Sequence, residues 1–478
     1  MSRADRFALL LSLLAILVSY LVTDRIFERL PHIEDEMAYA WQADAVAGGR
    51  LTVPSPVAPK SFLVPFVVDY HGQRFGKYPP GWPALLGIGV LFGARSWVNP
   101  LLAGLAVWLA YRLGKRVSTE TVGLLTAGLT LTSPFFLMNS GSLLSHPFGL
   151  VLSEAFALAW LDAWEDEPTI NPWWPTMAAA LSLGMLALTR PLTAVAVAFP
   201  FALHGLYLLV RGDRQTRRRL VIFGMAALGV ACLLFVWQFA VTGDPRINPY
   251  TLWWPYDKIG FGRGVGRLES GHTMYQAWIN TKFSLYVGAH DLFGWGKFSW
   301  IFLPFGVVAA FRYRMGKALL LGSVILSLAV FYLAYWIGSS LFGPRYYYEG
   351  LFSLTLFSAL GIAWLAGWPV RSGDAWQRVH GWQKARPLAI TALVVFLLSV
   401  NLLEYTPKRL AAMHGLYGVY RARLEPFLRP EAQAMTPALV VVHPFDWVEY
   451  GTLLELQDPW LKTPFIFIIS RRDRKSVV

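Results

Sequence analysis

Three consecutive acidic residues, Glu34, Asp35 and Glu36, open the stretch Ile33–Gly49, a few residues after the first apolar segment of the chain. Apolar residues follow them at helical spacing, which predicts a short amphipathic helix on a membrane surface with Asp35 and Glu36 near its N-terminus. Carboxylates in that position can act as caps, because a helix N-terminus carries partial positive charge. A carboxylate held at the membrane–water boundary can also act as a general base toward a hydroxyl group presented from outside.

Two basic segments are candidates for anion binding near these acids. Within Gly72–Leu86, Arg74 and Lys77 precede a Pro-Pro turn that leads into an apolar helix. A lysine at an interface ordinarily extends its amine to water, whereas one fixed by a rigid turn is a suitable point charge for a phosphate. Arg190 interrupts an apolar region immediately before Pro191. Since isolated charges beside hydrocarbon are costly, Arg190 either reaches water from the interface or serves a site.

The stretch Leu341–Leu351 combines a guanidinium, three tyrosines and a carboxylate. Arg345 and Glu349 are four residues apart, so one interpretation is an ion pair along a helix within an aromatic belt. The other is a phosphate or diphosphate site, in which Arg345 binds the anion and the hydroxyls of Tyr346 and Tyr347 donate further hydrogen bonds.

His146 and Glu154 form a further polar position in the stretch Ser140–Phe156. His146 is predicted at the outer end of a helix, with Glu154 two turns deeper, inside the bilayer. An ionisable residue within a span indicates a functional site, unless it simply bonds to a neighbouring helix.

The elements that must position these side chains are membrane helices. Hydrophobic residues make up 55% of the 478 residues and charged residues only 15%, whereas soluble proteins have about 25% charged residues. Because a spanning helix needs about 20 apolar residues, the sequence predicts an α-helical polytopic membrane protein with about eleven spans. The candidate spans are Phe7–Thr23, Trp97–Leu113, Thr121–Met138, Pro147–Ala163, Trp174–Leu188, Thr193–Val210, Leu220–Val241, Phe298–Phe311, Ala318–Ile337, Leu351–Trp368 and Pro387–Leu403.

Basic residues set the predicted orientation, because cytoplasmic loops are enriched in Lys and Arg. With the N-terminus in the cytoplasm, each inside loop except the acidic one at 165–167 carries basic residues. The short apolar stretch Trp82–Gly93 is then predicted to lie in the outer interface, since a further span there would move every later basic cluster outside. The basic residues used are Arg3, Arg6, Arg112, Lys115, Arg116, Arg211, Arg214, Arg217, Arg218, Arg219, Arg312, Arg314, Lys317, Arg371, Arg378, Lys384 and Arg386.

This topology predicts a membrane domain, 1–403, in a bacterial-type inner (plasma) membrane, with outer loops at 25–96 and 242–297. Residues 404–472 contain the β-like runs Ala438–Val442 and Phe465–Ile469, which predict a small, truncated α/β segment on the outer side. The last residues, 473–478, are interpreted as an adapter-encoded artefact and are excluded from the fold.

Composition also excludes several classes of protein. The formal net charge of +13 lies largely in short loops between apolar runs, so it does not indicate nucleic-acid binding. Cys232 is the only cysteine, which excludes an intramolecular disulfide and a cysteine-based metal site.

The order of the motifs resembles the GT-C superfamily of membrane glycosyltransferases. An outer loop begins with "DE" (Asp35 and Glu36), a "KYPPG" turn that starts at Lys77 follows, and a helix begins after "TRP", which contains Arg190. The similarity extends from about Phe7 to Leu403. It is greatest to the branch that holds protein O-mannosyltransferases and lipid A aminoarabinose transferase.

The resemblance implies an inverting transfer of a sugar from a polyprenyl-phosphate donor to a hydroxyl acceptor on the outer face. It gives Asp35, with Glu36 as its neighbour, the role of activating the acceptor. It implies that Lys77 binds the lipid phosphate. Arg190 and Arg345 correspond to phosphate-binding positions by their place in the chain. A lipid phosphate leaving group mainly needs positive charge around it.

The chain departs from the family pattern in its second acid. Related enzymes often carry one in a later outer loop, for which Glu154 or Asp244 are the candidates here. Some members bind a divalent metal at the acidic motif, where His32, Asp35 and Glu36 are the available ligands, although three ligands this close in sequence are not a good signature.

Two other functions remain open at this point. A transporter or flippase of lipid-linked sugars would also need cations and intramembrane acids, and an oligosaccharide ligase would share the phosphate clamp. Acceptor choice is assigned to the outer loop 242–297, whose aromatic rings can stack on sugars. The aromatic residues proposed for this are Trp253, Trp254, Tyr256 and Tyr275.

Overall fold

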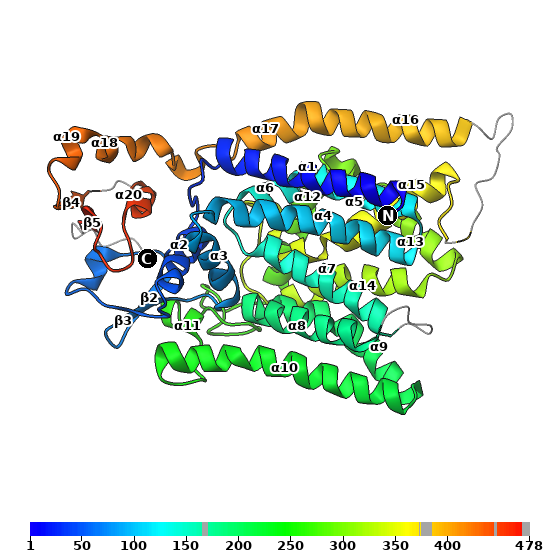
Figure 1. Ribbon diagram of the computed structural model, residues 1–478, viewed down its shortest axis with the longest axis horizontal. Helices are drawn as coiled ribbons and strands as arrows, with labels where there is room; N and C mark the ends of the chain where they lie inside the picture. The colour runs from blue at the N-terminus through cyan, green and yellow to red at the C-terminus, as the bar shows by residue number, and fades with distance from the viewer. Residues whose placement is uncertain (165–170, 372, 374–384, 444–446, 471–478) are drawn as a thin grey trace.

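The computed structural model describes residues 1–164, 171–371, 373, 385–443 and 447–470. Long helices lie side by side along the longest axis of the molecule, and shorter elements gather at one end (Figure 1). The helices of the bundle are α1 (Arg3–Arg25), α4 (Val98–Val117), α5 (Glu120–Leu131), α6 (Pro134–Gly141), α7 (His146–Ala163), α8 (Trp173–Thr189), α9 (Pro191–Arg211), α10 (Arg214–Thr242), α12 (Met274–Asp291), α13 (Leu303–Arg312), α14 (Gly316–Tyr332), α15 (Leu351–Ala366), α16 (Ala385–Val400) and α17 (Thr406–Ala411).

The bundle is built from helices of a membrane protein. Each of the eleven apolar segments predicted from the sequence contains a helix. In the described part of the chain, five segments are long and apolar enough to cross a membrane, or up to seven if two bent pairs each count as one span. A helical membrane protein is therefore confirmed, whereas the number of eleven spans is not. The five segments are Arg3–Arg25, Pro191–Arg211, Arg214–Thr242, Arg345–Ala366 and Ala385–Leu428.

The predicted span Thr121–Met138 is not one straight helix. α5 and α6 meet at a 60° bend. Ser133 caps α6 by accepting a hydrogen bond from the backbone N–H of Phe136, and Pro134 has no N–H with which to continue α5. The Ser133 cap and Pro134, rather than a change in hydropathy, therefore divide this segment into two helices.

The region 242–297, predicted as an outer loop, contains two helices. These are α11 (Pro249–Trp253) and α12. α12 is followed by a 98° bend into the helical segment Gly296–Arg312. The polar and aromatic composition of this region favoured a loop in the sequence analysis. The structure instead has α12 there, a helix as long as others in the bundle.

Glycines allow α13 and α15 to approach closely. A Cβ atom on Gly306 would collide with the carbonyl oxygen of Phe357, and one on Gly361 would collide with the carbonyl oxygen of Phe302. Small residues that let backbones approach are the usual means of packing helices where lipid removes the hydrophobic driving force.

We expect Gly306→Ala to lower the stability of the detergent-solubilised protein by about 1–3 kcal/mol, because a backbone atom cannot yield as a flexible side chain can. Gly224→Ala on α10 is the matched control, since no atom lies within 4 Å of the added Cβ there. Thermal aggregation followed by size-exclusion chromatography measures both variants. Equal melting curves for the two would contradict the close packing of α13 on α15.

One end of the bundle carries the elements that will form the site. α2 (Glu34–Ala47) packs on α3 (Gly81–Leu91), and the Trp82 indole N–H donates to the carbonyl of Leu143 at 3.0 Å, which attaches α3 to the turn between α6 and α7. A three-stranded antiparallel sheet joins them, with strand order β1-β3-β2. Its strands are β1 (Val53–Pro54), β2 (Val67–Tyr70) and β3 (Gln73–Gly76).

The predicted helix that carries the acids is confirmed as α2, but it is not amphipathic. Every residue from Glu36 to Ala43 is buried. The sheet, α3 and the C-terminal segment cover the faces that the sequence pattern assigned to water, so the apolar spacing alone gave the wrong exposure.

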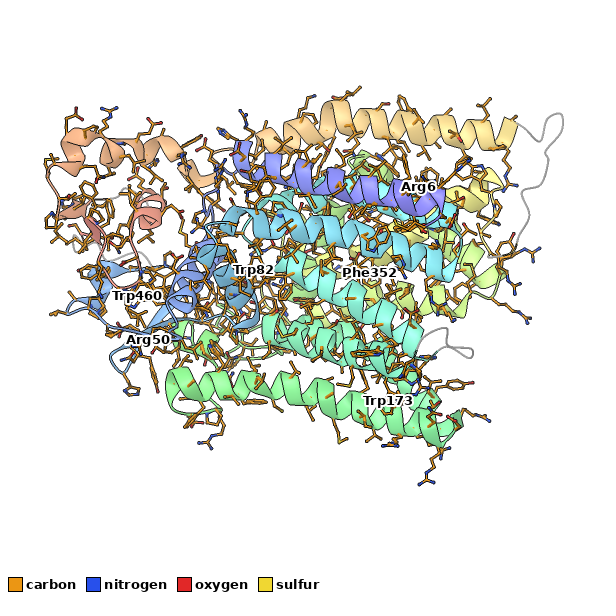
Figure 2. The ribbon with its side chains drawn as sticks, viewed as in Figure 1. Arg6, Arg50, Trp82, Trp173, Phe352 and Trp460 are labelled. Carbon is orange, nitrogen blue, oxygen red and sulfur yellow. The ribbon has the colours of Figure 1, made fainter. Side chains whose placement is uncertain are left out.

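The C-terminal segment packs against this end of the bundle. The two β-like runs are strands, β4 (Ala438–Val442) and β5 (Phe465–Ile469), which pair in parallel. The helices of this segment are α18 (Glu425–Leu428), α19 (Pro430–Gln433) and α20 (Trp447–Leu453). Trp460 lies against Gly48 at the end of α2, and Figure 2 shows Trp460 and Arg50 at the end of the molecule away from Arg6 and Trp173. The proposed boundary near residue 403 stays a prediction.

Basic residues gather at the opposite end of the bundle. Lys115 at the end of α4 pairs with Asp5 at the start of α1 (2.7 Å), and Arg116 pairs with Asp162 at the end of α7 (2.8 Å). These two pairs tie the start of α1 and the ends of α4 and α7 together at this end, while the orientation of the chain in the membrane stays a prediction. Four predictions concern residues outside the described ranges: the acidic loop at 165–167, Arg378, Lys384 and the tail 473–478.

Candidate active site

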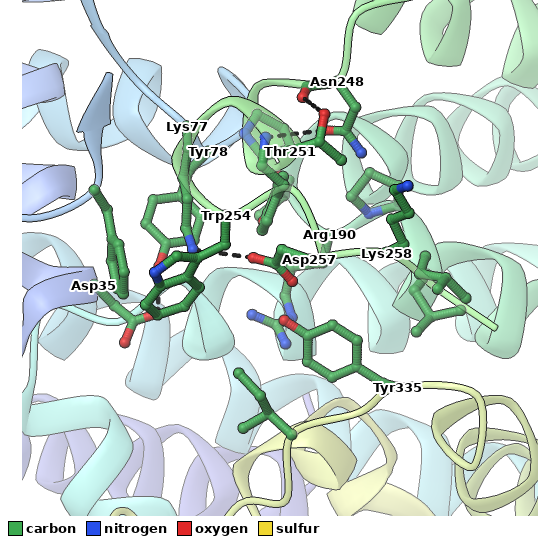
Figure 3. Close-up of a pocket in the computed structure, with 18 of the residues that line it drawn as sticks. Asp35, Lys77, Tyr78, Arg190, Asn248, Thr251, Trp254, Asp257, Lys258 and Tyr335 are labelled. Atoms are coloured by element: carbon green, nitrogen blue, oxygen red, sulfur yellow. Dashed lines mark hydrogen bonds and ion pairs between the residues drawn. The ribbon is translucent and has the colours of Figure 1, made fainter. Parts of the chain in front are cut away.

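A cavity of about 970 Å³ lies at the end of the bundle that carries α2 and α3. Its walls come from segments far apart in sequence: the start of α2, the turn after β3, the junction of α8 and α9, α11 with the loop that follows it, and the turn at Arg345. Figure 3 labels Asp35, Lys77, Arg190 and Asp257 from four of these segments. The ionisable side chains that line it, other than tyrosines, are Glu34, Asp35, Lys77, His146, Arg190, Arg246, Asp257, Lys258 and Arg345.

Asp35, in the first turn of α2, faces this cavity. Its Oδ1 accepts a hydrogen bond from the Tyr78 hydroxyl at 2.6 Å, and its Oδ2 lies 3.4 Å from Nη2 of Arg345. Burial opposes ionisation of Asp35, but Arg345, the Tyr78 hydroxyl, Lys77 and Arg190 together outweigh it and lower its pKa. The carboxylate is thus ionised and held by a long, weak contact to a cation.

Lys77 enters the cavity from the turn after β3. Its backbone N–H donates to the carbonyl of Phe66 at 2.9 Å, and Pro79 and Pro80 follow before α3 begins, so the position of the backbone is fixed. The Nζ atom lies 3.2 Å from Oδ2 of Asp257. Burial lowers the pKa of Lys77, and the carboxylate of Asp257 opposes that shift.

Arg345 and Tyr346 also line the cavity. Arg345 lies at the start of a 3₁₀ turn, Arg345–Gly350. Its Nη1 is buried and has no hydrogen-bond partner among the described residues. A guanidinium with one weak contact and one free nitrogen is available to an anionic ligand.

Arg190 occupies the junction between α8 and α9 and is held by several partners. Its Nε pairs with Oε1 of Glu349 at 2.9 Å, and its Nη1 donates to the Ser145 hydroxyl at 3.2 Å. The Nδ1 atom of His146 lies 3.2 Å from the same Glu349 oxygen. Glu349 therefore pairs with Arg190, and the sequence-based ion pair with Arg345 is wrong.

Glu36 points away from the cavity although it is adjacent to Asp35. One oxygen accepts the backbone N–H groups of His32 (2.8 Å) and Ile33 (3.2 Å), and the other accepts that of Leu143 (2.7 Å). Burial raises the pKa of Glu36 to about 7, more than these donors lower it. The capping interpretation thus describes Glu36, which also ties α2 to the α6–α7 turn.

Three other predicted residues lie outside the cavity lining. Arg74 donates to the carbonyl of Phe62 at 2.7 Å and stacks on Trp41. Tyr347 is buried beside Tyr332, with 6.1 Å between their ring centroids. Glu154 is fully buried in α7, and neither of its carboxylate oxygens has a hydrogen-bond partner among the described residues.

Sequence reasoning missed Asp257, which is the acid of the later loop that faces the site. Its Oδ1 accepts from the Trp336 indole N–H at 3.1 Å, while Oδ2 holds Lys77. Asp244, the candidate named instead, forms an exposed pair with Arg246 (2.9 Å). The available signal was the position of Asp257 within the Trp- and Tyr-rich stretch that had already been assigned to ligand contacts.

Of the aromatic residues predicted to contact the acceptor, Trp254 lines the cavity. Trp253 packs edge-on against Phe66 (5.6 Å between ring centroids), and Tyr256 stacks on Trp254 (5.9 Å). Tyr275 is 71% exposed and is not part of the lining. The contribution of these rings to acceptor choice stays a prediction.

The predicted metal ligands do not converge. His32 is buried with Nδ1 on the carbonyl of Leu30 (2.9 Å), Glu36 is held by backbone N–H groups, and Asp35 faces Arg345. No group of three or more His, Cys, Asp or Glu side chains suited to a metal ion occurs among the described residues. These residues therefore do not fit a divalent ion.

Comparison with known proteins shows what this chain is similar to. Residues 79–238 match the family described as dolichyl-phosphate-mannose-protein mannosyltransferase. Among solved structures, the fold is that of GT-C membrane glycosyltransferases, so the resemblance predicted from the motifs is confirmed. A search of curated proteins by sequence finds no match.

The similar structures have low sequence identity and establish the shared fold. ArnT from Cupriavidus metallidurans bound to undecaprenyl phosphate has a TM-score of 0.62 at 15% identity, over 96% of this chain and 85% of that one. The Archaeoglobus fulgidus oligosaccharyltransferase has a TM-score of 0.52 at 12% identity, over 95% and 61%. The arabinofuranosyltransferase AftD from Mycobacteria has a TM-score of 0.52 at 15% identity, over 97% and 32%.

Proposed function

We propose that this chain transfers a sugar from a polyprenyl-phosphate donor to a hydroxyl acceptor. The observation that carries the proposal is one cavity in which the carboxylate of Asp35 faces the side chains of Lys77, Arg190 and Arg345. This is the pair of charges the reaction needs, a base for a weak nucleophile and cations for an anionic leaving group. The family match and the undecaprenyl phosphate bound by the similar ArnT support the lipid-linked donor.

The chemistry is a single displacement at the anomeric carbon, with inversion. Asp35 accepts the proton of the acceptor hydroxyl as its oxygen attacks the carbon from the face opposite the phosphate. The bond between the anomeric carbon and the phosphate oxygen breaks, and its electron pair leaves with the polyprenyl phosphate. Lys77, Arg190 and Arg345 bind the leaving phosphate, whose negative charge increases in the transition state. The free Asp35 carboxyl then releases its proton to water.

Donor binding activates the base in this scheme. Arg345 holds the resting pKa of Asp35 down, and a phosphate that takes over the guanidinium weakens that effect. The pKa of Asp35 then rises, and a carboxylate with a higher pKa is a stronger base. The long contact of 3.4 Å between Arg345 and Asp35 is compatible with such an exchange of partners.

We place the cavity on the outer face of a bacterial-type inner membrane, with the N-terminus in the cytoplasm. The support is that α2 and α3, which carry the cavity, lie at the end of the bundle opposite the start of α1, where Lys115 and Arg116 form their ion pairs. Cytoplasmic loops attract basic residues, so the cavity end is assigned to the outside. Cysteine accessibility at Arg50 and Arg211, in inverted and right-side-out vesicles, tests the orientation.

We expect Arg345→Gln to raise the KM for the donor about 10- to 100-fold, because one charge-assisted contact to a phosphate contributes about 1.5–3 kcal/mol. Arg29→Gln is the control, since Arg29 is an arginine paired with Asp24 (2.6 Å) outside the cavity. Initial rates against donor concentration give both values. An unchanged KM for Arg345→Gln would remove Arg345 from the phosphate site.

The decisive experiment uses purified protein in detergent with a panel of radiolabelled polyprenyl-phosphate sugars and crude membrane acceptors. Sugar transfer by wild type, absent from a folded Asp35→Asn variant, would support the proposal and identify the donor. Tight binding with neither transfer nor release would favour a transporter of lipid-linked sugars. Transfer from polyprenyl diphosphate donors alone would favour an oligosaccharide ligase.

A further inference from the structure

The ion pair between Lys77 and Asp257 is almost completely removed from solvent. The two side chains are 4% and 2% exposed, with 3.2 Å between Nζ and Oδ2. Buried ion pairs contribute little to stability, because the loss of hydration offsets the attraction. A pair placed at such cost in the wall of the cavity is therefore better explained by what it does to Lys77 than by what it adds to the fold.

Aromatic rings surround the ammonium group of Lys77. Its Nζ lies 3.7 Å from the ring centroid of Phe66, 4.6 Å from that of Trp254 and 5.1 Å from that of Tyr250. Ring faces attract a cation but accept its hydrogen bonds weakly. The carboxylate of Asp257 thus supplies the strong acceptor in this cage, and its removal would favour the neutral amine.

The two partners lie on different kinds of element. Lys77 lies on a turn fixed by the Phe66 contact and by the prolines that follow. Asp257 lies on the loop between α11 and α12, where its backbone N–H donates to the carbonyl of Trp254 at 2.9 Å. A movement of Asp257 away from Lys77 disrupts no helix, whereas a movement of Lys77 would displace the start of α3.

We propose that Asp257 is a displaceable counter-ion for Lys77: it keeps the ammonium charged and directed into the cavity, and it gives way to the phosphate of the lipid-linked donor. This inference rests on the proposed function and adds a positioning residue to it. Asp257 occupies the place that the phosphate takes, so it prepares the site and also competes with the ligand.

The charged and titratable groups around Lys77 limit how its protonation responds to pH. Asp35 and Glu34 approach from α2, Tyr78 from the same turn, Tyr250 from α11 and Asp257 from the following loop. Of the carboxylates in the described ranges, Asp257 is the one in direct contact with Nζ. Its neutralisation should therefore move the titration of Lys77 to lower pH more than any other single change.

The test measures binding of tritiated farnesyl methyl phosphate to full-length protein in phosphatidylcholine nanodiscs. This lipid phosphodiester carries one negative charge throughout the range from about pH 6.5 to about pH 9. Wild type should bind about equally at both limits. Asp257→Asn should bind several-fold more tightly at the lower limit, because competition is gone, and should lose about tenfold per pH unit once Lys77 deprotonates.

Further variants separate this role from a merely structural one. Lys77→Arg/Asp257→Asn should bind tightly at both limits, because arginine stays charged. Glu404→Gln, in an exposed pair with Lys408 (2.8 Å), should match wild type. The proposal would be overturned if Asp257→Asn bound the phosphodiester more weakly than wild type by the same factor at both pH limits, and if the added Lys77→Arg change did not restore binding.

A ligand-independent readout distinguishes this inference from the proposed function. Acylation of Lys77 by a water-soluble reagent, followed by mass spectrometry, reports the neutral amine. The labelling profile of Asp257→Asn should begin at lower pH than that of wild type. If no form binds the phosphodiester but this shift occurs, the lipid-phosphate donor is wrong and the counter-ion role stands; an unchanged profile overturns the counter-ion role.

Discussion

We expect the Asp35→Asn variant to transfer sugar about 10²- to 10⁴-fold more slowly than wild type and still to bind the donor, since this is the usual contribution of a general base. The amide has the size of the carboxylate and its oxygen can accept the Tyr78 hydroxyl as Asp35 does, so the variant should fold. Loss of the negative charge also frees Arg345 for the phosphate. Single-turnover rates together with equilibrium donor binding measure the two effects separately.

The pH dependence provides an independent check on Asp35. Its lowered pKa in the free protein keeps the carboxylate ionised throughout the neutral range, so kcat/KM should fall only in strong acid. The phosphate shields Arg345 in the donor complex, so the acid limb of kcat should lie at higher pH than that of kcat/KM. Asp69→Asn, which changes an exposed carboxylate on β2, should keep wild-type kinetics. A folded Asp35→Asn variant with wild-type rates would remove Asp35 from the mechanism.

Glu36→Ala should destabilise the protein by about 3 kcal/mol or more, because it leaves three buried N–H groups without an acceptor. Those groups belong to His32, Ile33 and Leu143, so the loss separates the start of α2 from the α6–α7 turn. Glu34→Ala, two residues earlier on the same helix, should change stability by less than about 0.5 kcal/mol. Thermal aggregation in detergent measures both.

The raised pKa of Glu36 also predicts how its contribution to stability changes with pH. The folded state binds the proton of Glu36 more tightly than the unfolded state, with a pKa of about 7 against the ordinary 4.5. The stabilising contribution from this group is therefore complete below about pH 4.5 and is lost as pH rises through about 7. The stability of wild type relative to Glu36→Gln should decline over this window. A difference that is constant or rises with pH would contradict the burial of Glu36.

The amino-acid sequence by itself determined the helical membrane fold. Runs of about 20 apolar residues require helices, because lipid leaves backbone groups without other partners. Local chemistry also identified the helix at Asp35, the turn at Lys77 and the strands β4 and β5, since each depends on neighbours in the chain.

Tertiary structure decided which carboxylate faces which cation. Asp35 and Glu36 are adjacent, but successive helical residues differ by about 100° in direction, so one faces the cavity and the other the α6–α7 turn. The sequence could not show which face each neighbour would cover. The same applies to exposure, because β-strands and the C-terminal segment bury a helix that the pattern predicts to be amphipathic.

Pairings between distant segments were likewise beyond local patterns. Glu349 is four residues from Arg345, which favours an ion pair on one helix, yet the turn directs it to Arg190 at the α8–α9 junction. Lys77 meets Asp257 across a separation of 180 residues. The spacing of residues along the chain determines helices and turns. The partners of a buried charge depend instead on which remote elements pack around it, and these are set by the packing of the whole bundle.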